Sequence, residues 1–63
     1  MSNWVKYPGN PLPVPGKWYM VSPTGRDVDA VRAQFTGYPV GFPQFVDIYL
    51  LPVFRGTIYW KEI

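Results

Sequence analysis

The sequence predicts a mainly β protein, a small antiparallel sheet or partly closed barrel of about four or five strands. Three observations predict it. Short runs of β-branched and aromatic residues recur along the chain. Clusters of Pro and Gly, which favour turns and loops, separate these runs. The chain has 63 residues, which allows one domain, so residues 1–63 are expected to form a single small domain.

Two strands and a proline-rich loop are expected in the N-terminal part of the chain. Residues 4–7, Trp-Val-Lys-Tyr, make a short first strand, and residues 17–21, Lys-Trp-Tyr-Met-Val, make the clearest one. The prolines within residues 8–16 remove backbone donors and fix φ, so this segment is expected to be an ordered loop. The next four residues, Ser-Pro-Thr-Gly at 22–25, have the chemistry of a tight turn.

Residues 26–35 fit two kinds of secondary structure. As a strand, they would follow the tight turn and complete a hairpin with residues 17–21, and this is the preferred interpretation. As a helix, Asp27 could cap the start and Gly37 would end it. The helical interpretation gives an α+β fold with one helix at about 27–35.

The C-terminal part is expected to contain an aromatic loop and two more strands. Residues 36–44 carry two glycines and two prolines interleaved with Tyr38, Val40 and Phe42. Residues 45–51 are rich in β-branched and aromatic side chains and predict a strand that Pro52 ends or places on an edge. Arg55-Gly56 predicts a turn, and residues 57–61 predict the last strand.

The residue types that most often carry catalysis are missing. The sequence contains no Cys and no His, which removes disulfides, thiol nucleophiles and the commonest general base, and makes a zinc site unfavourable. Asp27 and Asp29 lie two apart and on a strand could hold Mg²⁺ or Ca²⁺, but a solvated turn beside Arg26 and Arg32 is the preferred interpretation. We therefore predict that the protein is not an enzyme and has no cofactor and no metal.

Aromatic side chains are more numerous than one small core can enclose. Three Trp, five Tyr and four Phe are present, so some rings are expected at the interface of a homo-oligomer or at a ligand surface. The loop around Tyr38 and Phe42 could either anchor an interface or cap an open end of the sheet. The candidate binding residues are Tyr38, Phe42, Trp18, Trp60, Tyr59, Arg26, Arg32 and Arg55, the arginines as contacts for the phosphate of a small ligand.

Charge argues against a dedicated nucleic-acid surface. The net charge is +2, and the six Lys and Arg residues are spread along the chain without a run. Aromatic strands with scattered basic residues still permit a single-stranded nucleic-acid-binding module as an alternative. No apolar stretch approaches the roughly 20 residues that span a bilayer, so we expect no membrane association and a cytoplasmic location.

Several short motifs resemble a family of short uncharacterised proteins from phages and prophages. Members open with Trp and a branched residue, carry Leu-Pro-x-Pro-Gly, continue into a hairpin, and end near a Trp-Met-Pro-Leu-Pro-like segment. The matching positions are Trp4-Val5, Leu12-Pro13, Pro15-Gly16, Tyr19-Met20-Val21, Gly25, Val46, Tyr49-Leu50 and Pro52, with Ala33 and Phe35 compatible. The sequence departs from the family at Ile48, where the family has His, at Tyr49, where it has Trp, and in the additional strand after residue 56. The resemblance implies a hairpin at 17–35 and a viral or prophage origin, and it carries no site residues.

These observations predict a non-catalytic accessory binding protein of the phage or prophage type. It would act stoichiometrically on a host or defence component in the host-cell cytoplasm, either a protein partner or a sequestered small nucleotide-like ligand. The two alternatives are a single-stranded nucleic-acid-binding module and a structural or assembly protein of a virion, whose function would be oligomerisation itself.

Overall fold

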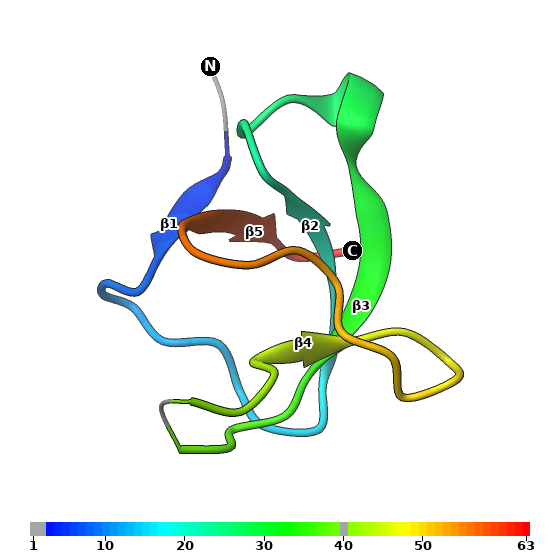
Figure 1. Ribbon diagram of the computed structural model, residues 1–63. Coiled ribbons are helices and arrows are strands. Elements are labelled where there is room, and N and C mark those ends of the chain that lie inside the picture. Colours follow the sequence, from blue (N-terminus) through cyan, green and yellow to red (C-terminus); the bar gives the residue numbers. More distant parts are fainter. Residues whose placement is uncertain (1–2, 40) are drawn as a thin grey trace.

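Five strands form one open antiparallel sheet in the computed structural model, which describes residues 3–39 and 41–63 (Figure 1). The strands are β1 (Val5–Tyr7), β2 (Trp18–Ser22), β3 (Val31–Phe35), β4 (Phe45–Val46) and β5 (Ile58–Lys61), and they pair in the order β1-β5-β2-β3-β4. The predicted mainly β fold is confirmed. Val40, which the sequence placed in the aromatic loop, lies outside the described residues, as do Met1 and Ser2.

Strand alternation places the core on one face of the sheet. On β2, Tyr19 and Val21 are buried while Trp18 and Met20 are half-buried on the other face. The antiparallel register pairs Tyr19 with Ala33 and Val21 with Trp60, so residues of three strands meet on the same side. The buried apolar residues are Tyr19, Val21, Ala33, Phe35, Phe45, Val46, Ile58 and Trp60.

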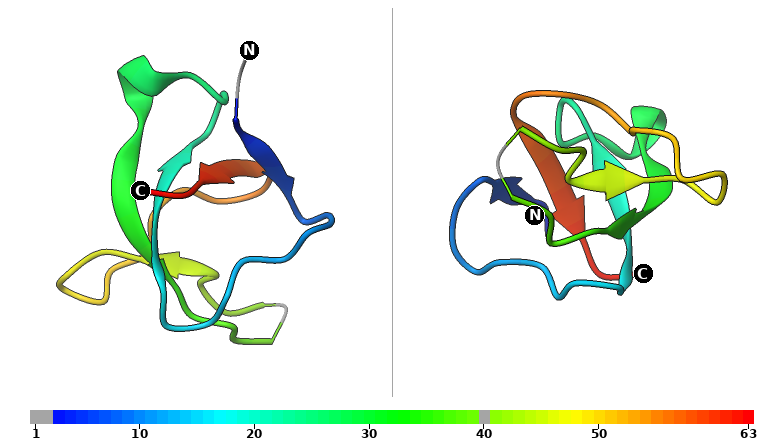
Figure 2. Two further views of the ribbon diagram at one scale, coloured as in Figure 1. Left: turned by 180° about the vertical axis from the view of Figure 1, so that it is seen from behind. Right: turned by 60° about the horizontal axis from the view of Figure 1, so that its bottom comes forward.

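The sheet is strongly curled (Figure 2). Side chains connect its two edge strands, β1 and β4. The ring of Tyr7 on β1 packs edge-on against Phe35 and Phe45, at centroid distances of 5.4 and 5.6 Å. Its hydroxyl donates a hydrogen bond of 2.6 Å to Oε1 of Gln44, beside β4. These contacts let a short sheet enclose its aromatic core, as a small domain without disulfides requires.

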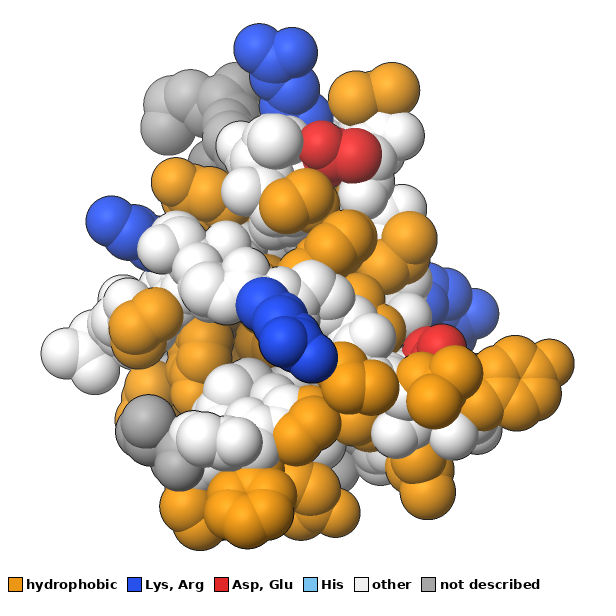
Figure 3. Space-filling view, viewed as in Figure 1, with side chains coloured by type: hydrophobic (Ala, Val, Ile, Leu, Met, Phe, Trp, Pro, Cys, Tyr) orange, Lys and Arg blue, Asp and Glu red, His pale blue; other side chains and the backbone are white. Residues whose placement is uncertain are grey.

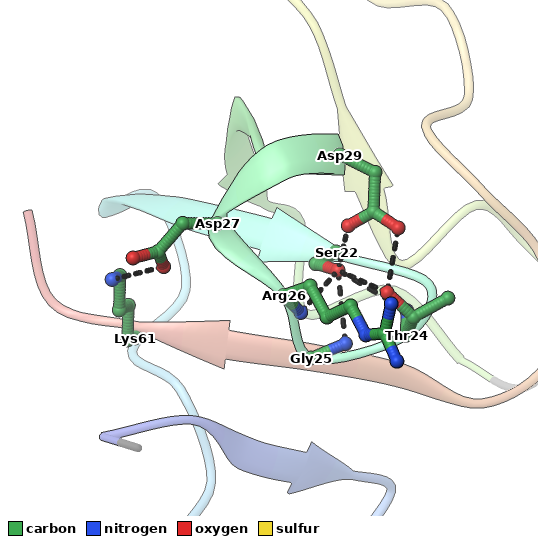
Figure 4. A network of polar contacts seen from close by, with 7 residues as sticks. All are labelled: Ser22, Thr24, Gly25, Arg26, Asp27, Asp29 and Lys61. Carbon is green, nitrogen blue, oxygen red and sulfur yellow. Dashed lines mark hydrogen bonds and ion pairs between the residues drawn. The ribbon is translucent and has the colours of Figure 1, made fainter. Parts of the chain in front are cut away.

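The connection between β2 and β3 is tied together by the buried hydroxyl of Ser22 (Figure 4). Its Oγ accepts hydrogen bonds from the backbone N–H of Thr24, Gly25 and Arg26 at 3.1, 2.9 and 3.2 Å. The same hydroxyl donates to Oδ1 of Asp29, whose Oδ2 accepts from Thr24 Oγ1 at 2.6 Å. The predicted hairpin is thus present, with a longer connection than the expected tight turn.

The alternative helix at about 27–35 is wrong. Only the single 3-10 turn η1 (Asp27–Asp29) forms, and Ala30 is already extended, with φ −79° and ψ 142°. Continuing as a helix would sacrifice the period-two pattern that buries Ala33 and Phe35 from β3 against the rest of the sheet. The tertiary packing of this segment therefore favours the strand.

The predicted strand over residues 45–51 is also wrong beyond Val46. The carboxylate of Asp47 accepts hydrogen bonds from the backbone N–H of Tyr49 and Leu51, at 2.8 and 3.0 Å, and turns the chain. Leu50 takes a left-handed conformation with φ 62°, and Pro52 returns beside Val46 in an isolated bridge. Residues 47–51 are therefore a tight loop, because the Asp47 side chain competes with the sheet for backbone donors.

Candidate binding surfaces

The aromatic loop, residues 36–44, is fixed by two polar side chains. The amide nitrogen of Gln44 donates to the carbonyl oxygens of Tyr38, Pro39 and Phe42 at 3.0, 3.2 and 2.9 Å. Thr36 Oγ1 donates to a further carbonyl of the loop and accepts from the Tyr38 N–H at 3.1 Å. This scaffold holds the rings of Tyr38 and Phe42 edge to face, 6.4 Å apart, with both side chains exposed.

A cleft of about 350 Å³ lies between the aromatic loop and the segment that leads into β5. Its lining residues are Gly41, Phe42, Pro43, Gln44, Pro52, Phe54, Arg55, Gly56 and Ile58. Apolar side chains form most of the walls, and Arg55 is the charged residue among those that line it. We call this hollow the Phe42–Arg55 cleft.

A second hollow, of about 320 Å³, lies on the opposite face of β2 and β3 from the core. Trp18, Arg32, Asp47 and Ile48 line it, and we call it the Trp18–Arg32 hollow. Next to it, the apolar tip (residues 48–51, Ile-Tyr-Leu-Leu) projects from the sheet in the loop drawn in yellow in Figures 1 and 2. All four side chains of the tip are exposed.

The structure brings some of the predicted binding residues together and separates others. Phe42 and Arg55 line one hollow, and Trp18 and Arg32 line the other, while Tyr38 stands exposed on the aromatic loop. The three arginines predicted as phosphate contacts therefore do not meet at one place: Arg55 lines one hollow, Arg32 lines the other, and Arg26 lines neither.

Two of the predicted aromatic residues are taken up by the fold. Trp60, predicted as a binding residue, is only 6% exposed and packs against Tyr19 at a centroid distance of 4.8 Å. It therefore belongs to the core and not to a binding surface. Tyr59 points the other way and is half-buried, and a Cβ built on Gly25 would lie 3.3 Å from its ring. Alternation along β5 decides this difference between two adjacent aromatic residues.

The apolar tip is the feature that the sequence analysis missed. The β-branched and aromatic side chains that dominate residues 45–51 predict a strand there. The signal that could have identified the loop is Asp47 at its start and Pro52 at its end, since Asp side chains close turns on the backbone two residues ahead. A loop between Asp47 and Pro52 leaves residues 48–51 outside the sheet, and their side chains are therefore exposed.

Asp27 and Asp29 do not form a shared cation site. Asp27 pairs with Lys61 at 2.7 Å, whereas Asp29 accepts from Ser22 and Thr24 (Figure 4). The hydrogen bond and charge of Lys61 lower the pKa of Asp27, and the hydrogen bonds from Ser22 and Thr24 lower the pKa of Asp29. Among the described residues, no three His, Cys, Asp or Glu side chains gather as metal ligands.

Charge and apolar surface are distributed differently. Figure 3 shows the basic side chains standing apart from one another, while hydrophobic side chains gather along the lower and right-hand parts of this face.

Searches of protein-family models, of curated proteins and of solved structures found no match to this chain. Within residues 3–39 and 41–63, the chain forms no helix with the length and apolar character that crossing a bilayer requires.

Proposed function

We propose that this chain is a non-catalytic binding protein that acts stoichiometrically on a protein partner through the Phe42–Arg55 cleft. The observation that carries the proposal is the combination of a fixed aromatic loop and an apolar cleft at its side. Tyr38 and Phe42 are exposed although each is held on a loop whose backbone is braced by Gln44. Aromatic anchors on a preorganised backbone lose little entropy when they bind, which is why they dominate protein interfaces.

The cleft suits an apolar side chain that lies next to a carboxylate. Burying one large side chain removes roughly 150–250 Å² from water, which at about 25 cal/mol per Å² corresponds to about 4–6 kcal/mol before the costs of association. Arg55 is exposed, so an ion pair with it adds only about 0–1 kcal/mol and acts mainly by discriminating against cations. The expected partner therefore presents an aromatic or aliphatic residue beside Asp or Glu.

The other ligand classes receive less support from the same surface. A nucleotide-like ligand needs several cations around its phosphate, and among the described residues that line this cleft Arg55 is the one cation. A single-stranded nucleic acid needs stacked rings along a basic groove, yet Trp60 belongs to the core and the arginines lie at separate places. The resemblance to short phage proteins favours a host or defence component in the host-cell cytoplasm as the partner.

Selection from a displayed library of random peptides tests this proposal. The immobilised wild-type protein is expected to enrich sequences that place a large apolar residue beside Asp or Glu. Arg55→Glu should enrich Lys or Arg at the same position, because the substitution reverses the charge at the rim of the cleft. Phe42→Ala should abolish enrichment, whereas Arg26→Glu, the same charge change away from both hollows, should select the wild-type motif.

Two results would contradict the proposal. One is the absence of any enriched motif, and the other is an identical motif for wild-type protein and Arg55→Glu. Competition with a nucleotide such as AMP is the third measurement. If AMP displaced the selected peptides at a concentration below their own dissociation constant, the ligand would be a small phosphate compound and not a protein.

A further inference from the structure

The apolar tip presents four consecutive large side chains that the fold of a single copy leaves mostly uncovered. Ile48, Tyr49, Leu50 and Leu51 are 72, 74, 74 and 58% exposed. The loop beneath them is well defined, since Asp47 Oδ1 accepts from two backbone N–H groups and the Asp47 carbonyl accepts from a third at 3.0 Å. A rigid loop that offers contiguous apolar surface is typical of an interface.

Backbone conformation gives a second, independent reason to assign a role to this loop. Leu50 has φ 62°, a region that Gly or Asn occupies far more readily than a bulky side chain does. Its side chain is not covered by the rest of the chain in return. Phe54, at φ 58°, shares this conformation but is half-buried, whereas Leu50 is exposed, and a bulky exposed residue held in a disfavoured conformation is a candidate for function.

The Trp18–Arg32 hollow adjoins the tip and is complementary to it. Ile48 belongs to both surfaces, and the hollow of about 320 Å³ has room for one projecting side chain of the size of Leu50 or Tyr49. The hollow also carries one cation and one anion, Arg32 and Asp47. Within the described part of the chain the ion pairs are Lys17–Glu62 and Lys61–Asp27, so Arg32 has no carboxylate of its own.

We infer that the apolar tip and the Trp18–Arg32 hollow together form a two-fold interface with a second copy of this chain. A knob, a hole and two opposite charges on one face are self-complementary: each tip enters the partner's hollow, and Arg32 of each copy faces Asp47 of the other. Asp47 Oδ2 accepts no hydrogen bond among the described residues, so it can accept the partner's guanidinium while Oδ1 still holds the loop.

The available area agrees with a reversible dimer. At roughly 150–200 Å² for a large side chain, the four exposed fractions amount to about 400–550 Å² per copy, or about 800–1,100 Å² for two tips. Specific interfaces begin at about 1,000 Å² in total, and the walls of the two hollows add to the tips. An interface of this size lies at the lower limit for specific association, so we expect a reversible monomer–dimer equilibrium between about 1 µM and about 1 mM. None of the four tip residues lines the Phe42–Arg55 cleft, so the inferred interface uses other residues and does not depend on the proposed function.

Sedimentation equilibrium from about 1 µM to about 1 mM tests the inference. Wild-type protein is expected to pass from monomer to dimer within this range. Leu50→Asn should raise the protein concentration at the midpoint of the monomer–dimer transition at least about tenfold. The variant should still fold because Asn tolerates a positive φ. Val28→Asn is the matched control, since Val28 is 88% exposed on η1, away from both the tip and the hollow, and should leave the midpoint unchanged.

A second pair of variants tests the charges. Asp47→Asn keeps the oxygen that accepts the loop's hydrogen bonds but removes the charge, and Arg32→Gln removes the opposite charge. Each single variant should raise the dissociation constant of the dimer about two- to tenfold. The double variant should have a dissociation constant no higher than that of the more weakened single variant, because both substitutions remove the same ion pair. A wild-type protein that stays monomeric to about 1 mM, an unshifted Leu50→Asn variant, or a mass that grows beyond the dimer would each overturn the inference.

Discussion

Replacing Ser22 with alanine should remove the polar centre of the β2–β3 connection. The side chain is fully buried, and its Oγ accepts from the backbone N–H of Thr24, Gly25 and Arg26. Each such bond contributes about 0.5–1.5 kcal/mol. The first and last of these residues are exposed, so water can partly replace the lost acceptor there, and the expected total is about 2–3 kcal/mol. Domains of this size have about 3–9 kcal/mol of stability, so the loss is large.

Urea unfolding followed by tryptophan fluorescence measures this effect. At an m value of about 1 kcal/mol per M, the midpoint should fall by about 2–3 M, and Tm should fall by about 10–20 °C. Thr57→Ala removes a hydroxyl from an exposed position and should change stability by less than about 0.5 kcal/mol. A Ser22→Ala variant that loses no more than this control would refute the reasoning, because the hydroxyl would then not organise the connection in solution.

Three further changes test the connection and the aromatic loop. Because hydrogen bonds hold the pKa of Asp29 below its ordinary value of 3.8, this carboxylate stabilises the fold above that pH and its contribution is lost as the pH falls towards the lower folded pKa. We therefore expect the free energy of unfolding, measured by urea titration at several pH values below about 4, to fall less steeply with decreasing pH in Asp29→Asn than in the wild-type protein. Gly37→Ala should cost at least about 1 kcal/mol more than Gly41→Ala in thermal unfolding, since both have positive φ but only the Gly37 Cβ would meet Pro15, at 2.9 Å. Gln44→Leu should weaken capture of selected peptides about threefold to tenfold, because it releases three carbonyls of the aromatic loop.

Local pattern was sufficient for the strands whose alternation coincides with burial. β2 and β5 lie within one residue of the predicted ranges, and the hairpin partner β3 follows from the inward positions of Ala33 and Phe35. The pattern gave the wrong result after Val46. Strand propensity is a property of single residues and does not include the hydrogen bonds that the Asp47 side chain makes to the following backbone. One carboxylate there captures two backbone donors that a longer β4 would have used.

The candidate site depends on relations that sequence spacing does not contain. Phe42 and Arg55 share a cleft because Pro52 returns beside Val46 and brings the following segment back to the aromatic loop. The separation of the arginines follows from the order of the strands, which a single sequence does not specify. Residue types identified the rings and the cations, and the fold decided which of them meet.

An NMR titration with two matched probes tests the central claim, which is that the Phe42–Arg55 cleft binds an apolar side chain beside a carboxylate. N-acetylphenylalanine carries the carboxylate, and N-acetylphenylalaninamide is its neutral counterpart. The acid is expected to shift the amides of Phe42, Phe54 and Gly56 with a dissociation constant of about 1 mM, about two- to fivefold tighter than the neutral probe. In Arg55→Gln the two probes should bind equally. Absence of shifts around the cleft, or equal binding of both probes to the wild-type protein, would contradict the account.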